Sequence, residues 1–85
     1  FNLDTAYPNP FNPVTNVDFA IPEAGNVSIK VYNLVGQVME TLVDDYKSAG
    51  FHTVSWDASS VPSGLYFITV ESGEKVSTQK LVLMK

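Results

Sequence analysis

The chain has 85 residues, enough for one domain, and carries five lysines, no arginine and nine carboxylates, for a net charge of −4. An acidic chain without arginine is poorly suited to nucleic-acid phosphates, and no apolar run approaches the roughly 20 residues that span a bilayer. The absence of cysteine excludes disulfides and thiolate metal sites. The chain begins at Phe1 without a signal-peptide pattern, so we expect it to be part of a longer protein.

Residues 1–15 are predicted to form an extended arm rich in proline and asparagine. Three prolines between residues 7 and 13 exclude a helix and weaken strand pairing, because proline lacks the amide proton and restricts the residue before it. The apolar side chains of the arm are expected to anchor it on a sheet: Phe1, Leu3, Tyr7 and Phe11.

Two strands with alternating apolar residues follow, and the turn at 22–26 between them predicts a hairpin. Their inward-facing residues are expected to be Val17, Phe19 and Ile21, then Val27, Ile29 and Val31. A third strand is predicted at 37–43. Its two faces are equally apolar, which leaves open the side that points inward.

The second half of the chain is also divided into short strands by turns and polar loops. Residues 44–50 are predicted to be a polar loop, and His52 to Trp56 a fourth strand. A turn at 59–64, a strand at 65–71, a tight hairpin at 72–74 and a last strand at 75–84 complete the pattern. No stretch has a helical period. The chain is therefore predicted to be all-β, an immunoglobulin-like β-sandwich of about seven short antiparallel strands, with a small barrel as the alternative.

One local feature favours the sandwich. Tyr66 follows a glycine turn at the start of a strand, an order that resembles the tyrosine corner of immunoglobulin-like domains. In such a corner the hydroxyl bonds back to the preceding loop. Tyr66, Ile68 and Val70 are then expected to face the core.

Residues able to carry chemistry are few and scattered. The sole histidine, His52, has no distinctive nucleophile near it in the sequence, and Asp44 with Asp45 lacks the pattern of a calcium loop. A pair of carboxylates drawn from Glu40, Glu71 and Glu74 would need a cleft that a chain of this size has little room for. We therefore predict no catalytic site, no metal and no cofactor.

Carbohydrate binding is the main alternative function considered from the residues. Sugar-binding sandwiches present flat aromatic rings, and Tyr32 and Phe67 are predicted to point outward. Trp56 alternates in phase with Val54, which favours a place in the core.

Several blocks of the sequence together resemble the type IX secretion C-terminal sorting domain, a family found at the ends of secreted proteins of Bacteroidetes and related bacteria. The opening Tyr7-Pro8-Asn9-Pro10-Phe11-Asn12-Pro13 is one block. The others lie in the family's order at residues 22–25, 31–37, 49–57, 61–67 and 80–85. Phe51 departs from the family pattern, in which a polar residue is more usual. The pattern also overlaps the immunoglobulin-like domain of the flagellar hook-capping protein, which would be a structural role.

The resemblance implies a non-catalytic sorting signal at the C-terminus of a secreted cargo that precedes Phe1. In the family, the type IX translocation machinery recognises this signal at the outer membrane. In many members a sortase-like peptidase then removes the signal, which leaves the cargo on the surface or in the medium. The shared terminal strand makes Lys80, Leu81, Val82, Leu83, Met84 and Lys85 the first expected recognition element. The segment Tyr7 to Pro13 is the second.

A terminal strand is expected at or near a sheet edge, where a partner could read it by strand addition. Its consecutive apolar residues, 81–84, have two explanations. Either both faces of the strand are buried, or one face is left for a partner.

Overall fold

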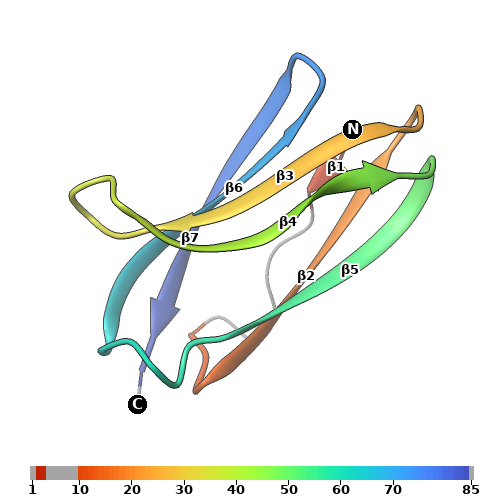
Figure 1. Cartoon of the computed structure of the whole chain (residues 1–85). Helices are drawn as coiled ribbons and strands as arrows, with labels where there is room; N and C mark the ends of the chain where they lie inside the picture. The colour runs from red at the N-terminus through yellow and green to blue at the C-terminus, as the bar shows by residue number, and fades with distance from the viewer. Residues whose placement is uncertain (1, 4–9, 85) are drawn as a thin grey trace.

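The computed structural model describes residues 2–3 and 10–84, which form seven strands in two sheets (Figure 1). One sheet has three strands in the order β1-β2-β5, and the other has four in the order β4-β3-β6-β7. All neighbouring strands are antiparallel. The predicted all-β sandwich is therefore confirmed. The strands are β1 (Asn2–Leu3), β2 (Val14–Ile21), β3 (Gly25–Tyr32), β4 (Val38–Lys47), β5 (Gly50–Asp57), β6 (Gly64–Ser72) and β7 (Lys75–Leu83).

The period-two alternation places the core between the two sheets. Each of β2, β3 and β6 buries every second side chain, because successive residues of a strand point to opposite faces. The buried apolar residues are Phe11, Val17, Phe19, Ile21, Val27, Ile29, Val31, Trp56, Ala58, Tyr66, Ile68, Val70, Leu81 and Leu83. All the inward-facing residues predicted for the first two strands are among them.

The predicted hairpin between the first two long strands is wrong. β2 pairs with β1 and β5, whereas β3 pairs with β4 and β6, so the turn at 22–26 carries the chain from one sheet to the other. Each strand has one apolar face, and the two faces meet across the core rather than lying side by side in one sheet. The tight hairpin between β6 and β7 is confirmed, with Gly73 at φ +61° in the left-handed region.

Strand β4 is longer than predicted, because residues 44–47 continue the strand instead of forming a loop. Asp44 and Asp45 pair with Ser28 and Val27 of β3 and remain exposed at the sheet edge. Two register shifts opposite β3 change which side of β4 points inward. As a result, Leu42 and its neighbour Val43 both pack partly against the core, which explains an apolar pattern with no preferred face.

The arm lies partly outside the described residues, which exclude 1 and 4–9. Two parts of it are strand. Asn2 and Leu3 form β1 beside β2, and Val14 and Thr15 already belong to β2. Phe11 is buried, as predicted for an anchor.

The tyrosine corner is present. The Tyr66 side chain is 4% exposed, and its hydroxyl donates a hydrogen bond of 2.6 Å to the carbonyl oxygen of Pro62. Ile68 and Val70 are fully buried behind it. The bond ties the loop before β6 to the start of that strand.

Replacing Tyr66 with phenylalanine should lower the free energy of unfolding by about 1 kcal/mol, because it removes one hydrogen bond and keeps the ring. Urea unfolding of the 85-residue chain measures the change. Tyr46→Phe is the control, since that side chain is 64% exposed, and it should shift stability by less than about 0.5 kcal/mol. Equal losses in the two variants would show that the corner bond contributes nothing of its own.

Candidate functional site

Strand β7 forms one edge of the four-stranded sheet, with β6 on its inner side. Near its end the side chains divide between two faces. Leu81 and Leu83 are buried in the core at 0% and 1% exposure. Lys80 and Met84 are exposed and Val82 is half-buried on the outer side. Of the two explanations for the consecutive apolar residues, the structure therefore supports the one with a single buried face.

The arm closes the outer edge of β7 at its C-terminal end. Phe11 forms a parallel bridge with Leu83. The Phe11 amide donates to the Val82 carbonyl oxygen at 2.9 Å, and the Met84 amide donates to the Phe11 carbonyl oxygen at 2.9 Å. Phe11, from one segment predicted for recognition, thus lies beside the end of β7, from the other. An added partner strand could pair with residues 82–84 only by displacing Phe11. While Phe11 is bound, a partner that approaches these residues would meet side chains rather than free backbone.

An aromatic cluster holds the arm in place. The Phe11 ring lies 5.5 Å from that of Trp56, measured between centroids, and the Trp56 ring lies 5.3 Å from that of Tyr66 in an edge-on contact. Such tilted pairs add to the energy of burial. The cluster joins the arm, β5 and β6. Trp56, at 2% exposure, is a core residue, as its alternation predicted.

The other described residues of the predicted arm segment are 10, 12 and 13, and all three are less buried than Phe11. Pro10 and Asn12 are exposed. Pro13 is half-buried, and its carbonyl oxygen accepts a 2.9 Å hydrogen bond from the Ala58 amide. Tyr7, Pro8, Asn9 and Lys85 lie outside the described residues. Nothing in the sequence pointed to the pairing of Phe11 with the last strand.

His52 has a structural environment. Its ring stacks on Phe19 at 5.3 Å, and its Nε2 is 2.7 Å from the carbonyl oxygen of Ser48. These contacts join β5 to the sheet core and to the turn before it. With Nε2 next to a backbone carbonyl, the ring is held by the fold rather than aimed at a nucleophile.

The carboxylates considered for catalysis do not converge. Glu40 on β4 lies opposite Val31, and Glu71 on β6 lies opposite Ser28, so the two flank β3 on different sides and three positions apart. Glu74 lies in the β6–β7 turn. Paired catalytic acids need to face one bond across a defined gap, and this arrangement does not provide one.

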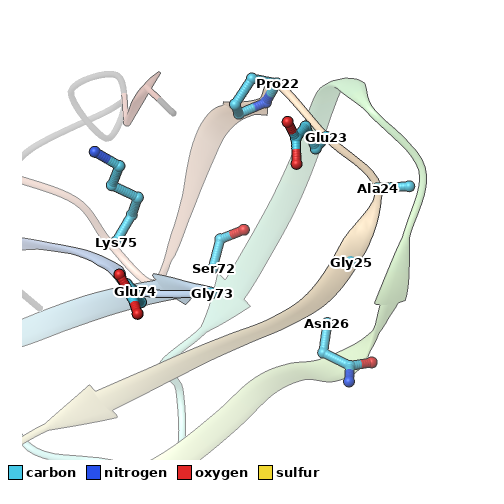
Figure 2. Close-up of a pocket in the computed structure, with 9 residues that line it drawn as sticks. All are labelled: Pro22, Glu23, Ala24, Gly25, Asn26, Ser72, Gly73, Glu74 and Lys75. Atoms are coloured by element: carbon cyan, nitrogen blue, oxygen red, sulfur yellow. The ribbon is translucent and has the colours of Figure 1, made fainter.

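A hollow of about 530 Å³ lies between the β2–β3 turn and the β6–β7 turn (Figure 2). Its lining is mostly exposed turn residues, with the side chains of Glu23, Glu74 and Lys75 at its rim. Catalysis needs side chains locked by packing and hydrogen bonds, and these turn residues are exposed to solvent. The hollow is also remote from the end of β7, which lies at the opposite end of that strand (Figure 1).

Residues 2–3 and 10–84 contain neither a helix that could span a membrane nor a cluster of side chains that could hold a metal ion. No helix in this part of the chain is long and apolar enough to cross a membrane. In the same residues, no group of three or more histidine, cysteine, aspartate or glutamate side chains is placed to hold a metal ion.

Comparison with known proteins gives a family. A search of curated proteins finds no match. The family model for the secretion system C-terminal sorting domain matches residues 5–84, which is nearly the whole chain and includes β2 to β7. Domains of this family direct export by the type IX system across the outer membrane, to the cell surface or the medium. By this match, and with a β-sandwich fold that agrees with it, the chain belongs to the type IX secretion C-terminal sorting domain family.

Proposed function

We propose that this chain is the non-catalytic sorting signal of a cargo that precedes Phe1, and that the outer face at the end of β7 is what the translocation machinery reads. The observation that carries the proposal is the alternation at the end of that strand. Leu81 and Leu83 are in the core, so a partner that binds the folded domain can reach Lys80, Val82 and Met84 instead. The match to the sorting family supports the role.

The arm has a supporting role in this proposal. By occupying the backbone positions at Val82 and Met84, Phe11 keeps the end of β7 in one defined conformation. A partner then meets a preorganised surface and loses less entropy on binding. The sortase-like peptidase implied by the family would act on the chain that joins the cargo to the domain.

The test is a secretion assay with a reporter that carries a signal peptide and residues 1–85 at its C-terminus, in a host with an intact type IX system. The combined substitution Lys80→Ser, Val82→Ser and Met84→Ser should reduce surface or medium delivery by about tenfold or more, while the core leucines remain. The matched control is Val76→Ser with Thr78→Ala, nearer the start of the same strand. Both of those side chains are exposed, and the control should be delivered at the wild-type level.

The outcomes distinguish a wrong sorting role from a wrong choice of recognition residues. A wild-type fusion that stays in the periplasm would exclude the sorting role in that host. A delivered wild type together with an equally delivered triple variant would leave the role intact and assign recognition to other residues. A translocon-deficient host should deliver neither form.

A carbohydrate- or surface-binding module is the second candidate. The observation in its favour is that Tyr32 and Phe67 are direct cross-strand partners on the outer face of the four-stranded sheet. Both are half-buried, however, and the burial of Trp56 removes the largest ring from the surface. Retarded migration of the domain in gels containing polysaccharide, lost on Tyr32→Ala, would support this candidate.

A further inference from the structure

The outer face of the four-stranded sheet has two chemically different halves. In the half near the end of β7, one row across the sheet is Val38, Tyr32, Phe67 and Lys80. Leu65 and Val82 are paired beside it, and Lys30 lies in the next row. We call Lys30, Tyr32, Leu65, Phe67, Lys80 and Val82 the lysine–aromatic patch. It has two positive charges and no carboxylate.

The other half of the same face is acidic. Ser28 of β3 has Asp44 on one side and Glu71 on the other. Although the chain as a whole has a net charge of −4, two of its five lysines lie in the patch, beside its apolar side chains. The positive sign of its charge distinguishes the patch from the rest of the face, where the exposed Tyr46 and Val76 lie beside carboxylates instead.

A shallow hollow extends the patch. It has a volume of about 240 Å³ and lies between the turn at 33–36 and the start of β6. Its lining includes three exposed aliphatic side chains, those of Leu34, Val35 and Leu65, which are 65%, 78% and 39% exposed. The turn itself is well defined, because the Asn33 side-chain oxygen accepts hydrogen bonds from the amides of Val35 and Gln37 at 3.1 and 2.9 Å. A well-defined turn presents its two apolar side chains in a fixed position.

We infer that the lysine–aromatic patch is an interaction surface for a protein that presents an apolar centre bordered by carboxylates. Aromatic and aliphatic side chains at the middle with charges at the rim are the usual composition of a protein interface. Complementary charge selects an acidic partner and steers its approach. Tyr32 and Phe67 are half-buried within the sheet face, which leaves a sugar only part of each ring to stack on.

This inference rests on the proposed function and deepens it. Lys80 and Val82 belong both to the proposed recognition strand and to the patch, so the partner that reads β7 would also cover β6 and β3. The sorting signal would then be a surface of the folded sheet rather than the terminal peptide alone.

The experiment uses substitutions outside β7, in the same reporter fusion. The double variant Lys30→Glu with Leu65→Glu alters the patch. The matched control is the double variant Lys47→Glu with Val76→Glu. Each variant replaces one lysine and one exposed aliphatic residue, and each changes the net charge from −4 to −7. Delivery should fall by about tenfold or more for the patch pair and stay within about twofold of wild type for the control. Thermal unfolding of each purified domain checks that all of them fold.

A second measurement identifies whether the molecule that binds the patch is a protein. Benzoylphenylalanine placed at Tyr32 should form a discrete crosslink to a membrane-fraction protein during export, and Lys30→Glu should abolish it. The same probe at Tyr46, on the acidic half of the face, should form none. A fall in delivery without any protein adduct would point to a carbohydrate occupant and overturn the inference. Wild-type delivery by the patch pair, with the β7 triple variant retained in the periplasm, would also overturn it and leave the proposed function standing.

Discussion

Deleting Leu81 to Lys85 is expected to unfold the domain as well as remove its terminal signal. The deletion takes two side chains from the core, Leu81 and Leu83, at 0% and 1% exposure. Loss of one buried leucine costs about 2–5 kcal/mol, and a small domain has only about 5–15 kcal/mol in total. The hydrogen bonds that Val82 and Met84 make with Phe11 are lost as well. The truncated chain should show no cooperative unfolding transition in urea and no near-ultraviolet circular dichroism from Trp56.

A chain that ends at Leu83 is the matched control. It keeps both core leucines and loses Met84, which is 59% exposed. Its unfolding free energy should stay within about 2 kcal/mol of the full chain, because the lost Met84 amide is one hydrogen bond to Phe11. A cooperative transition of wild-type strength in the chain lacking 81–85 would contradict the placement of β7 in the core. Failed secretion of that truncation would therefore not separate lost recognition from lost folding.

Replacing Phe11 with alanine is expected to lower the free energy of unfolding by about 3–5 kcal/mol. The side chain is 2% exposed and contacts the Trp56 ring, so its removal leaves a cavity between the arm and β5. Phe11→Leu refills most of that space and should cost less than about 1.5 kcal/mol. Asn12→Ala, at an exposed arm position, should change stability by less than about 0.5 kcal/mol. Urea unfolding of the three variants tests the ranking.

The same variants distinguish two roles for the arm. If Phe11 acts as a structural anchor, secretion of the reporter fusion should follow stability, with the leucine variant delivered and the alanine variant impaired. If a partner reads the Phe11 ring directly, the leucine variant would lose delivery while remaining folded. That second result would assign recognition to the arm and contradict the anchoring role proposed for Phe11.

Much of the core could be predicted from the sequence, because apolar residues at every second position show which face of a strand points inward. Val17, Phe19 and Ile21 in one segment, and Val27, Ile29 and Val31 in the next, are all buried. The glycine turn before Tyr66 was sufficient to predict its corner hydrogen bond. Burial of Trp56 followed from its phase with Val54. In each case a side-chain pattern along one strand decides the outcome locally.

Prediction failed where the outcome depended on a neighbouring strand. The turn at 22–26 resembles a hairpin turn, yet it joins strands of different sheets. Residues 44–47 are polar enough for a loop, yet pairing with β3 makes them strand. The two register shifts that leave β4 without a preferred inward face also have no signature within β4 itself.

The sequence by itself determined the all-β class, the inward-facing residues and the family to which the chain belongs. Only the tertiary structure decided that Phe11 pairs with Leu83, that β7 turns one face to the core and the other to solvent, and that Lys30, Phe67 and Lys80 share one patch. The physical reason is that strands pair through backbone amides and carbonyls, which every residue except proline carries alike. Side-chain alternation specifies which face of a strand is apolar, whereas the choice of neighbouring strand depends on how all the apolar faces are buried together.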